Sequence, residues 1–320
     1  MLLSCILLLV GLALVVFGAD YLVEGASAVA RRFGLSEFII GLTIVGMGTS
    51  APEMVVSFIG AAQGNADIAI GNVVGSNIFN TLLILGVTAL LLPIPVTAAN
   101  RRRDIPVNLL ISVLLVVLGL EKTFFGWGTD GLNPWDGAVL LLLFAAYMVY
   151  SFRQGRAEES GEPEAAPKPW KPALSVLMIV GGLAGLIAGG ELFVRSATDI
   201  AQRLGWSDKF IAITILAGGT SMPELATCIA AAVKKKGQLA LGNIIGSNVF
   251  NILLILGGSA LIHPLNVSGL GPVDLGALLA SAVALALGCS VGKEKRLGIA
   301  QGVLFLLLWG SYMAYLIIQL

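Results

Sequence analysis

The stretch Gly48-Thr49-Ser50-Ala51-Pro52-Glu53 recurs almost unchanged as Gly219-Thr220-Ser221-Met222-Pro223-Glu224. Each copy places one carboxylate in an otherwise apolar run. Proline lacks a backbone N–H and its ring clashes with the carbonyl of residue i−4, so both copies predict a helix that breaks or kinks at the proline. Near that break, backbone carbonyls lose their regular partners, and the threonine and serine hydroxyls lie beside them. A broken helix with free carbonyls, hydroxyls and an acid at membrane depth predicts a site that replaces the hydration shell of a hard cation.

The composition of the chain places these motifs in a membrane. Of its 320 residues, 57% are hydrophobic and 12% are charged, and the mean hydropathy is +0.93, far above that of soluble proteins. Apolar runs long enough to cross a bilayer recur along the whole length. We therefore expect an all-α membrane protein with ten transmembrane helices, over residues 2–19, 36–61, 67–92, 105–120, 134–152, 173–197, 208–233, 239–262, 273–291 and 297–318.

The basic residues predict how these helices are oriented, because Lys and Arg concentrate in cytoplasmic loops. With the N-terminus outside, fifteen Lys and Arg residues fall in cytoplasmic loops and four fall on the other side. Both termini are therefore expected to be extracytoplasmic. The net charge of zero gives no indication of a nucleic-acid partner. The three cysteines show no metal-ligand spacing and are expected to be small buried hydrophobic residues.

The two halves of the chain are repeats of one sequence. A shift of 171 positions aligns residues 18–93 with 189–264 without a gap, and twelve of sixteen positions are identical between 71–86 and 242–257. Because five helices per half is an odd number, the second half must cross the membrane in the opposite sense, as in the inverted repeats of secondary transporters. The stretch between the halves is polar and rich in Pro and Glu, so it cannot bury a core. The predicted organisation is an N-terminal repeat over 1–152, a cytoplasmic linker over 153–172 and an inverted C-terminal repeat over 173–320.

A second repeated motif, Gly-Asn-x-x-Gly-Ser-Asn-x-Phe-Asn, occupies residues 71–80 and 242–251. On a helix, its first Asn, its Ser and its last Asn are four residues apart and share one face. We expect Gly75 and Gly246 to let another backbone approach closely. Two interpretations of the polar face remain open. It is either a hydrogen-bonded seam between helices, which we favour for Asn72, Asn77, Asn243 and Asn248, or a set of cation ligands, which we favour for Ser76, Asn80, Ser247 and Asn251.

Glu53 and Glu224 allow a similar choice between a structural and a functional role. The structural alternative is a carboxyl that is protonated or paired inside the protein. A charge near the centre of a bilayer costs at least a few kcal/mol, and no Lys or Arg lies at matching depth in the sequence. An external cation is the simplest partner, so we expect both glutamates to bind one.

Together, these paired motifs resemble the alpha-1 and alpha-2 repeats of the cation/calcium exchanger superfamily, and most closely those of the prokaryotic sodium/calcium exchangers. The resemblance covers both halves and implies an integral protein of the prokaryotic plasma (inner) membrane. It also implies a core of eight helices around a cluster of cation sites, with helices 2 and 7 broken at the ion site and helices 1 and 6 sliding across the core. Some relatives, including potassium-dependent exchangers, carry Asp where this chain has Asn251, and this departure weakens a potassium-coupled interpretation.

The resemblance further implies a ligand set at matching positions of this sequence. Calcium would be held by both glutamate carboxylates and by backbone oxygens of two threonines. One sodium ion would use Glu53, Ser50, Ser76 and the carbonyl region of Gly46. Another would use Glu224, Ser221, Ser247 and the carbonyl region of Ala217, with Asn80 and Asn251 lining the middle. The implied metal-binding residues are Glu53, Glu224, Thr49, Thr220, Ser50, Ser221, Ser76, Ser247, Asn80, Asn251, Gly46 and Ala217.

The expected function is secondary active antiport that exchanges sodium for calcium by alternating access. Two ionised carboxylates left empty at the midplane are costly to move between membrane faces. One calcium ion or several sodium ions neutralise them, so loaded states are expected to switch and the empty state is not. The open alternative is a proton-coupled antiporter of calcium or another divalent cation, which uses the same carboxylates; a channel or a membrane scaffold is a more remote one.

The sequence gives no indication of an enzyme, because it contains no nucleophile–base set and no metal-ligating histidine cluster. No cofactor is expected. The expected partners are calcium and sodium ions and membrane lipid, with no nucleic acid and no obligatory protein partner.

Overall fold

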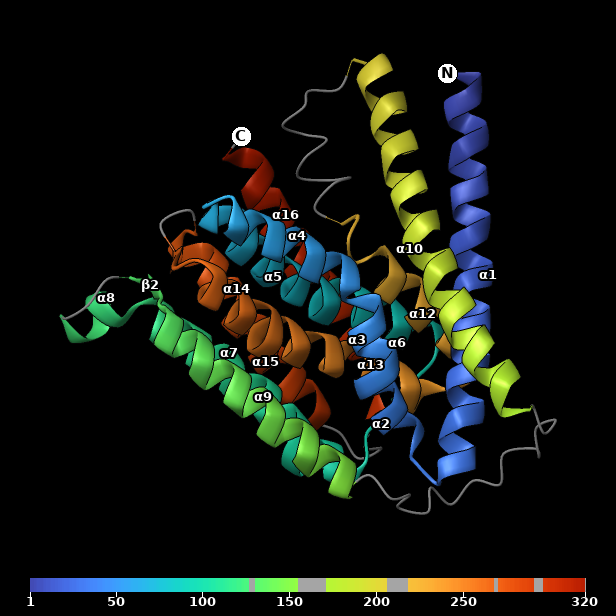
Figure 1. Ribbon diagram of the computed structural model, residues 1–320, viewed down its shortest axis with the longest axis horizontal. Coiled ribbons are helices and arrows are strands. Elements are labelled where there is room, and N and C mark those ends of the chain that lie inside the picture. Colours follow the sequence, from blue (N-terminus) through green and yellow to red (C-terminus); the bar gives the residue numbers. More distant parts are fainter. Residues whose placement is uncertain (127–129, 155–170, 206–217, 268–269, 291–295, 320) are drawn as a thin grey trace.

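The computed structural model describes residues 1–126, 130–154, 171–205, 218–267, 270–290 and 296–319. These residues are almost entirely helical, which confirms the predicted all-α class (Figure 1). In the first half the elements are α1 (Leu2–Phe33), α2 (Glu37–Ile40), η1 (Gly41–Val45), α3 (Gly46–Thr49), α4 (Ala51–Ala62), α5 (Ala66–Ile78), η2 (Phe79–Ile84), α6 (Leu85–Leu91), β1 (Ile94–Pro95), η3 (Asn100–Asp104), α7 (Ile105–Gly119), α8 (Glu121–Phe125), β2 (Gly131–Leu132) and α9 (Pro134–Gln154). In the second half they are α10 (Pro172–Arg203), α12 (Met222–Val233), α13 (Gly237–Val249), η5 (Phe250–Leu256), α14 (Gly257–Ile262), β3 (Leu265–Asn266), α15 (Pro272–Ser290), β4 (Arg296–Leu297) and α16 (Ile299–Ile318).

The described part of the chain contains seven helices long and apolar enough to cross a membrane, or eight when the bent pair Glu37–Thr49 and Ala51–Ala62 is one span. The chain is therefore an integral membrane protein, but the predicted count of ten spans is not confirmed. Two predicted spans account for the difference. The helix α7 is only 15 residues long, and the first part of the predicted span 208–233 lies outside the described residues, so that only the 12-residue α12 represents it.

The first Pro-containing motif breaks its helix, as predicted. The two helical segments around it meet at 48°. Ser50 stands between them with φ −81° and ψ 7°, outside the helical region, and Pro52 occupies the first turn of α4. In the second half, α12 begins in the same way, with Ser221 at φ −87° and ψ 8° and Pro223 in the first turn. A proline is tolerated there because its missing N–H has no helical partner to lose.

The helices α1 and α10 form a pair that stands beside the remaining helices (Figure 1). Their backbones are in contact through glycines: a Cβ at Gly18 would lie 2.8 Å from the carbonyl oxygen of Gly182, and one at Gly189 would lie 2.8 Å from that of Gly11. Small residues allow such close packing of membrane helices. Along most of their length, α1 and α10 are therefore held together by close backbone packing rather than by polar contacts.

Both helices of this pair extend beyond their predicted spans, which ended at residues 19 and 197. The prediction of these ends was wrong because an apolar run and a helix do not have to end at the same residue. In α1, charged residues follow Ala19 and end the apolar run, but the helix continues. The helix α1 continues for fourteen more residues and ends at Phe33. It ends there because Gly34 adopts the left-handed conformation (φ 62°) and donates its N–H to the carbonyls of Ala30 and Arg31.

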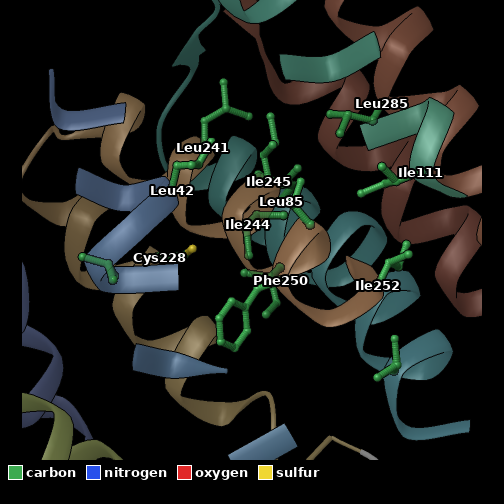
Figure 2. Close-up of a cluster of buried hydrophobic side chains, with 14 of the residues drawn as sticks. Leu42, Leu85, Ile111, Cys228, Leu241, Ile244, Ile245, Phe250, Ile252 and Leu285 are labelled. Atoms are coloured by element: carbon green, nitrogen blue, oxygen red, sulfur yellow. The ribbon is translucent and has the colours of Figure 1, made fainter. Parts of the chain in front are cut away.

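The centre of the protein is α13, in which twelve of thirteen residues are buried. Figure 2 shows part of the apolar cluster around it, where Ile244 and Ile245 lie near Leu42 and Leu85. Close approach at Gly246 is confirmed, because a Cβ there would lie 2.2 Å from the carbonyl oxygen of Leu42. At Gly75, no atom of another described helix lies within 4 Å of such a Cβ, so the close approach predicted there is not found.

The three cysteines do not all share the predicted burial. Cys228 and Cys289 are buried, as expected of small hydrophobic residues, and all three thiols are free. Cys5 is exposed, so the prediction was wrong for this residue. It lies near the start of α1, among exposed apolar neighbours such as Leu3 and Ile6. An apolar sequence around a cysteine therefore did not distinguish a side chain in the core from one on the outer face of a membrane helix.

Two short antiparallel strand pairs tie the halves together. Ile94 of β1 pairs with Leu297 of β4, and Leu132 of β2 pairs with Leu265 of β3. Each pair joins a loop of the first half to a loop of the second. In Figure 1 the two chain termini lie at the same end of the molecule, in keeping with termini on one side of the membrane; which side that is stays a prediction.

Candidate ion-binding site

The two glutamates of the Pro-containing motifs lie at the first turns of α4 and α12. Both side chains are fully buried, with an exposed fraction of 0%. The N-terminus of a helix carries a partial positive charge, which favours a carboxylate at this position. The break that Pro52 and Pro223 introduce therefore places each acid where the backbone stabilises its charge.

Each glutamate accepts a hydrogen bond from a serine of the opposite half. Ser221 Oγ donates to Glu53 Oε1 at 2.9 Å, and Ser50 Oγ donates to Glu224 Oε1 at 2.9 Å. These contacts cross between the halves, so the motifs meet at one place although they are 171 residues apart in the sequence. The structure thus brings the two carboxylates into one buried cluster.

Two further serines, from the second motif, join the same cluster. Ser76 Oγ lies 3.4 Å from Glu53 Oε1, and Ser247 Oγ lies 3.3 Å from Glu224 Oε1. Ser247 Oγ also lies 3.3 Å from the carbonyl oxygen of Gly46. All four predicted serines therefore surround the glutamates, and every serine–carboxylate contact involves the same carboxylate oxygen, Oε1.

The other oxygen of each glutamate is buried without a hydrogen-bond donor among the described residues, and so are three amide oxygens, those of Asn80, Asn108 and Asn251. Four of these atoms belong to the repeated motifs: Glu53 Oε2, Glu224 Oε2, Asn80 Oδ1 and Asn251 Oδ1. Buried polar atoms are normally satisfied, and all four of these atoms are acceptors, two from each half. Carboxylate and amide oxygens are the ligands that Ca²⁺ takes. The set fits a positively charged oxygen-seeking ligand and does not fit an apolar one.

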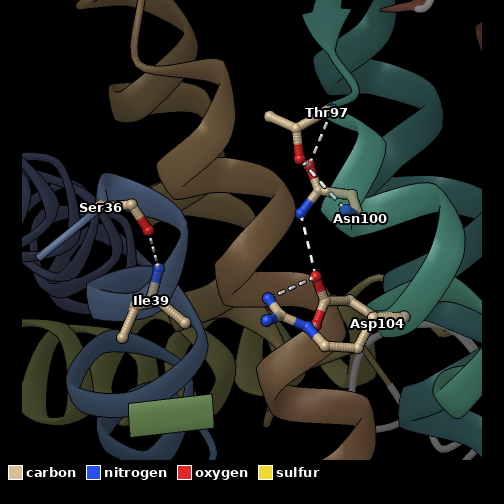
Figure 3. A network of polar contacts seen from close by, with 6 residues as sticks. Ser36, Ile39, Thr97, Asn100 and Asp104 are labelled. Carbon is tan, nitrogen blue, oxygen red and sulfur yellow. Dashed lines mark hydrogen bonds and ion pairs between the residues drawn. The ribbon is translucent and has the colours of Figure 1, made fainter. Parts of the chain in front are cut away.

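Asp104 provides a contrast, because it is a fully buried carboxylate that the protein satisfies itself. In the cluster at the start of α7, Arg103 Nε donates to its Oδ1 at 2.7 Å and Asn100 Nδ2 donates to its Oδ2 at 3.2 Å (Figure 3). No ion pair found among the described residues involves Glu53 or Glu224. The two glutamates thus differ from Asp104 in having no internal cation there.

The predicted threonines and carbonyls lie around the cluster with one exception. Thr49 is fully buried, and its hydroxyl points to Asn243 Oδ1 at 3.2 Å. Thr220 Oγ1 lies 3.5 Å from Asn72 Oδ1. Thr49 Oγ1 also lies 3.4 Å from the carbonyl oxygen of Gly46. Ala217 lies outside the described residues.

Asn72 and Asn243 lie between helices, as the seam interpretation predicts. Asn72 Nδ2 donates to the backbone oxygen of Glu53 at 3.2 Å and to Ser57 Oγ at 3.0 Å. Its counterpart Asn243 donates from Nδ2 to Cys228 Sγ at 3.4 Å. Each asparagine therefore links its own Glu-bearing helix to a threonine of the opposite half.

Asn80 and Asn251 lie in the π-helical segments η2 and η5. Such segments are rare and frequent at functional sites. Asn80 Nδ2 donates to Asn248 Oδ1 at 3.3 Å, and Asn251 Nδ2 donates to Asn77 Oδ1 at 3.0 Å. The nitrogen atoms of both amides thus donate to Asn248 and Asn77, for which the sequence favoured a role in a hydrogen-bonded seam between helices.

Comparison with known proteins agrees with this geometry. A family profile described as "Sodium/calcium exchanger protein" matches residues 3–153 and 174–318. The chain is 33% identical to the sodium/calcium exchanger MaX1 of Methanosarcina acetivorans, over 82% of this chain and 84% of that one. It is 38% identical to the inner membrane protein YrbG of Escherichia coli, over 90% and 89% of the two chains.

The fold is similar to that of a solved sodium-calcium exchanger. A structure described as NCX_Mj soaked with Na⁺ and Sr²⁺ superimposes with a TM-score of 0.84 and 35% sequence identity, over 98% of both chains. The same family is indicated by the sequence profile, which matches most of both halves. The chain therefore belongs to the sodium/calcium exchanger protein family, whose members are cation transporters rather than enzymes.

Proposed function

We propose that this protein exchanges sodium for calcium across the membrane, by alternating access to the buried cluster around Glu53 and Glu224. The observation that carries the proposal is the set of four buried acceptor oxygens without a donor among the described residues. MaX1 is named a sodium/calcium exchanger, and NCX_Mj a sodium-calcium exchanger. Cation exchange is common to these relatives; the choice of sodium as counter-ion for this chain is our proposal.

The proposed ligand set is the one that the resemblance to the cation/calcium exchangers implies. Both carboxylates bind calcium together with backbone oxygens of the threonines, and sodium ions use the same glutamates with the serines. Asn80 and Asn251 line the middle of the site. The full set is Glu53, Glu224, Thr49, Thr220, Ser50, Ser221, Ser76, Ser247, Asn80, Asn251, Gly46 and Ala217.

Charge explains why such a site exchanges ions instead of releasing them freely. Two buried carboxylates carry two negative charges, which a low-dielectric interior tolerates poorly. One Ca²⁺ or several Na⁺ ions neutralise this charge, so a loaded site moves between membrane faces more readily than an empty one. Transport of one ion then depends on return of the other, which is antiport.

The proposed architecture supplies the two access states. Residues 1–152 and 173–320 form repeats of opposite orientation, joined by a cytoplasmic linker over 153–172, with both termini extracytoplasmic. The gap-free alignment of the halves supports this arrangement, and so do the crossed contacts between Ser50 and Glu224 and between Ser221 and Glu53. The pair α1 and α10, which stands beside the other helices (Figure 1), is the unit we propose to slide.

Calcium uptake into proteoliposomes tests the proposal. Vesicles are loaded with NaCl, KCl or choline chloride at one pH and diluted into calcium without sodium. We expect uptake into sodium-loaded vesicles alone, with no requirement for potassium, because position 251 is an amide.

A second series replaces the sodium gradient by a pH gradient. Uptake that follows the pH gradient and ignores sodium would contradict sodium coupling and support proton-coupled calcium antiport. Equal uptake into all three kinds of vesicle would indicate a channel.

A further inference from the structure

Among the asparagines of the second motif, Asn77 has a contact pattern that a packing role does not require. We propose that Asn77 is a positioning residue that fixes the orientation of the Asn251 amide, so that Asn251 presents oxygen and not nitrogen to the transported cation. The inference rests on the proposed function, because it assigns a role within the same ion site. It concerns a residue that does not itself belong to the proposed ligand set.

The Asn251 side chain is fully buried, and its two ends have different surroundings. Its Nδ2 donates to Asn77 Oδ1 at 3.0 Å, whereas its Oδ1 has no donor among the described residues. Turning the amide by half a rotation would exchange these ends. The NH₂ group, which can only donate, would then face the cation, and two oxygens would face each other at Asn77.

Asn77 cannot relieve that conflict by turning its own amide. Its Nδ2 donates to the backbone oxygen of Asn248 at 3.3 Å, and a backbone carbonyl only accepts hydrogen bonds. With the nitrogen held there, Oδ1 must face residue 251. The backbone carbonyl of Asn248 in α13 therefore fixes the orientation of the Asn77 amide, and the Asn77 amide fixes that of Asn251.

The counterpart in the first half lacks this constraint. Asn80 Nδ2 donates to Asn248 Oδ1 at 3.3 Å, and Asn248 Nδ2 donates to Thr81 Oγ1 at 2.9 Å. A hydroxyl both donates and accepts, so Asn248 keeps a partner whichever way it turns. Thr81 aligns with Ile252 in the second half, and the Ile252 side chain has no polar group. The amide of Asn80 is therefore bound by an asparagine with a hydroxyl partner, whereas the amide of Asn251 is bound by an asparagine that is held by a backbone carbonyl.

The consequence is that Asn77 matters for calcium affinity only while residue 251 has a nitrogen end to exclude. An aspartate at this position is expected to stay protonated, because Glu53 and Glu224 repel a third buried negative charge. Its O–H can donate to Asn77 Oδ1 while its other oxygen faces the site, and its two oxygens are equivalent whichever way it turns. A double-mutant comparison therefore separates positioning from packing. A residue needed only for packing would cost the same with an amide or a carboxylate at position 251.

The test uses four full-length proteins: wild type, Asn77→Leu, Asn251→Asp and the double variant. Calcium binding to purified protein is measured by titration calorimetry, and the calcium concentration for half-maximal uptake is measured in sodium-loaded proteoliposomes. We expect Asn77→Leu to weaken calcium binding about tenfold when residue 251 is the native asparagine, because a buried ligand loses its fixed orientation. When it is combined with Asn251→Asp, we expect a further change of less than about twofold, with maximal uptake rates little affected by the Leu substitution in either case.

Thr88→Val serves as a matched control. Thr88 is buried in α6 of the same half, and among the described residues its hydroxyl donates only to the carbonyl oxygen of Ile84, at 2.7 Å. Its loss is expected to affect thermal stability but not calcium affinity. If Asn77→Leu does not give monodisperse protein, Asn77→Ala replaces it in the same design with the same expectation.

The outcomes distinguish the inference from the proposed function. A wild-type protein that neither binds calcium nor takes it up would overturn the proposed function. A wild-type protein that exchanges normally, combined with equal losses for Asn77→Leu in both backgrounds or no loss in either, would overturn the positioning role alone.

Discussion

At the residue scale, the clearest feature of the site is that the two oxygens of each glutamate differ in their hydrogen bonding. Oε1 of Glu53 and Oε1 of Glu224 accept hydrogen bonds from serines, and Oε2 of each is left without a donor among the described residues. The serines thus orient the carboxylates without neutralising them. What remains is a pair of negative charges with two acceptor atoms available to an ion.

Removing one of these charges is expected to abolish calcium transport. Glu53→Gln or Glu224→Gln keeps the shape and the serine contact but leaves one negative charge against a divalent ion, and it introduces an amide donor into the site. Calcium uptake by sodium-loaded proteoliposomes should fall to the level of empty vesicles, while size-exclusion chromatography shows intact protein. Glu121→Gln in α8, distant from both motifs in sequence, is the control and should transport normally. Near wild-type exchange by either site variant would assign that glutamate a structural role.

Sequence alone predicts the residues of this site better than their contacts. The two motifs identify the glutamates, serines and terminal asparagines because each residue type there is unusual inside an apolar run. The sequence does not reveal that Ser50 and Ser221 donate to the glutamate of the opposite half. Nor does it reveal that Asn80 and Asn251 donate to asparagines of the opposite half. Those contacts depend on how α5 and α13 cross, which follows from packing of the whole chain rather than from local pattern.

At the element scale, the sequence predicted the helix bend at a proline but did not predict the π-helical segments. Pro52 has no N–H and must disturb its helix, and the structure bends there by 48°. The π-helical segments η2 and η5 lie in the apolar runs Phe79–Ile84 and Phe250–Leu256, which contain neither Pro nor Gly. No local signal distinguishes these runs from ordinary helix, so their register must come from tertiary contacts.

Lys234, just after α12, connects the paired helices to the rest of the protein. Its Nζ lies 2.7 Å from Asp20 Oδ1 and 2.8 Å from Glu24 Oε1, both on α1. Partial burial acts to lower the pKa of Lys234, but its hydrogen bonds to these two acids outweigh burial and the net shift is upward. The residue aligned with Lys234 in the first half is Gln63, which has no charge to form the equivalent contact with α10.

Replacing Lys234 by Met should weaken the contact between α1 and α12. The three side chains are partly exposed, so the expected loss is at most about 1 kcal/mol in the free energy of unfolding. Thermal unfolding of the purified variant in low salt measures it. The neighbour Lys235, replaced by Met, is the control. Equal stability of the two variants would show that the ion pairs contribute nothing.

At the scale of the whole molecule, two halves of related sequence enclose one site that neither completes alone. Each glutamate accepts a hydrogen bond from a serine of the other half, and the amides of Asn80 and Asn251 each donate to an asparagine of the other half. The strand pairs β1–β4 and β2–β3 join the halves again at their loops. The repeat was evident from the sequence, whereas the predicted count of ten membrane spans is not confirmed among the described residues.

The most direct test of this account is the position of a bound divalent cation in an experimental structure. Crystals of the protein soaked with Ca²⁺, or with the heavier Sr²⁺, locate the ion by its anomalous scattering. The account predicts one divalent ion between the two glutamates, with Oε2 of Glu53 and Oε2 of Glu224 at about 2.3–2.6 Å, as in calcium sites generally. Glu53→Gln crystals under the same conditions should lack it. An ion bound elsewhere, with both Oε2 atoms hydrogen-bonded to the protein instead, would contradict the account.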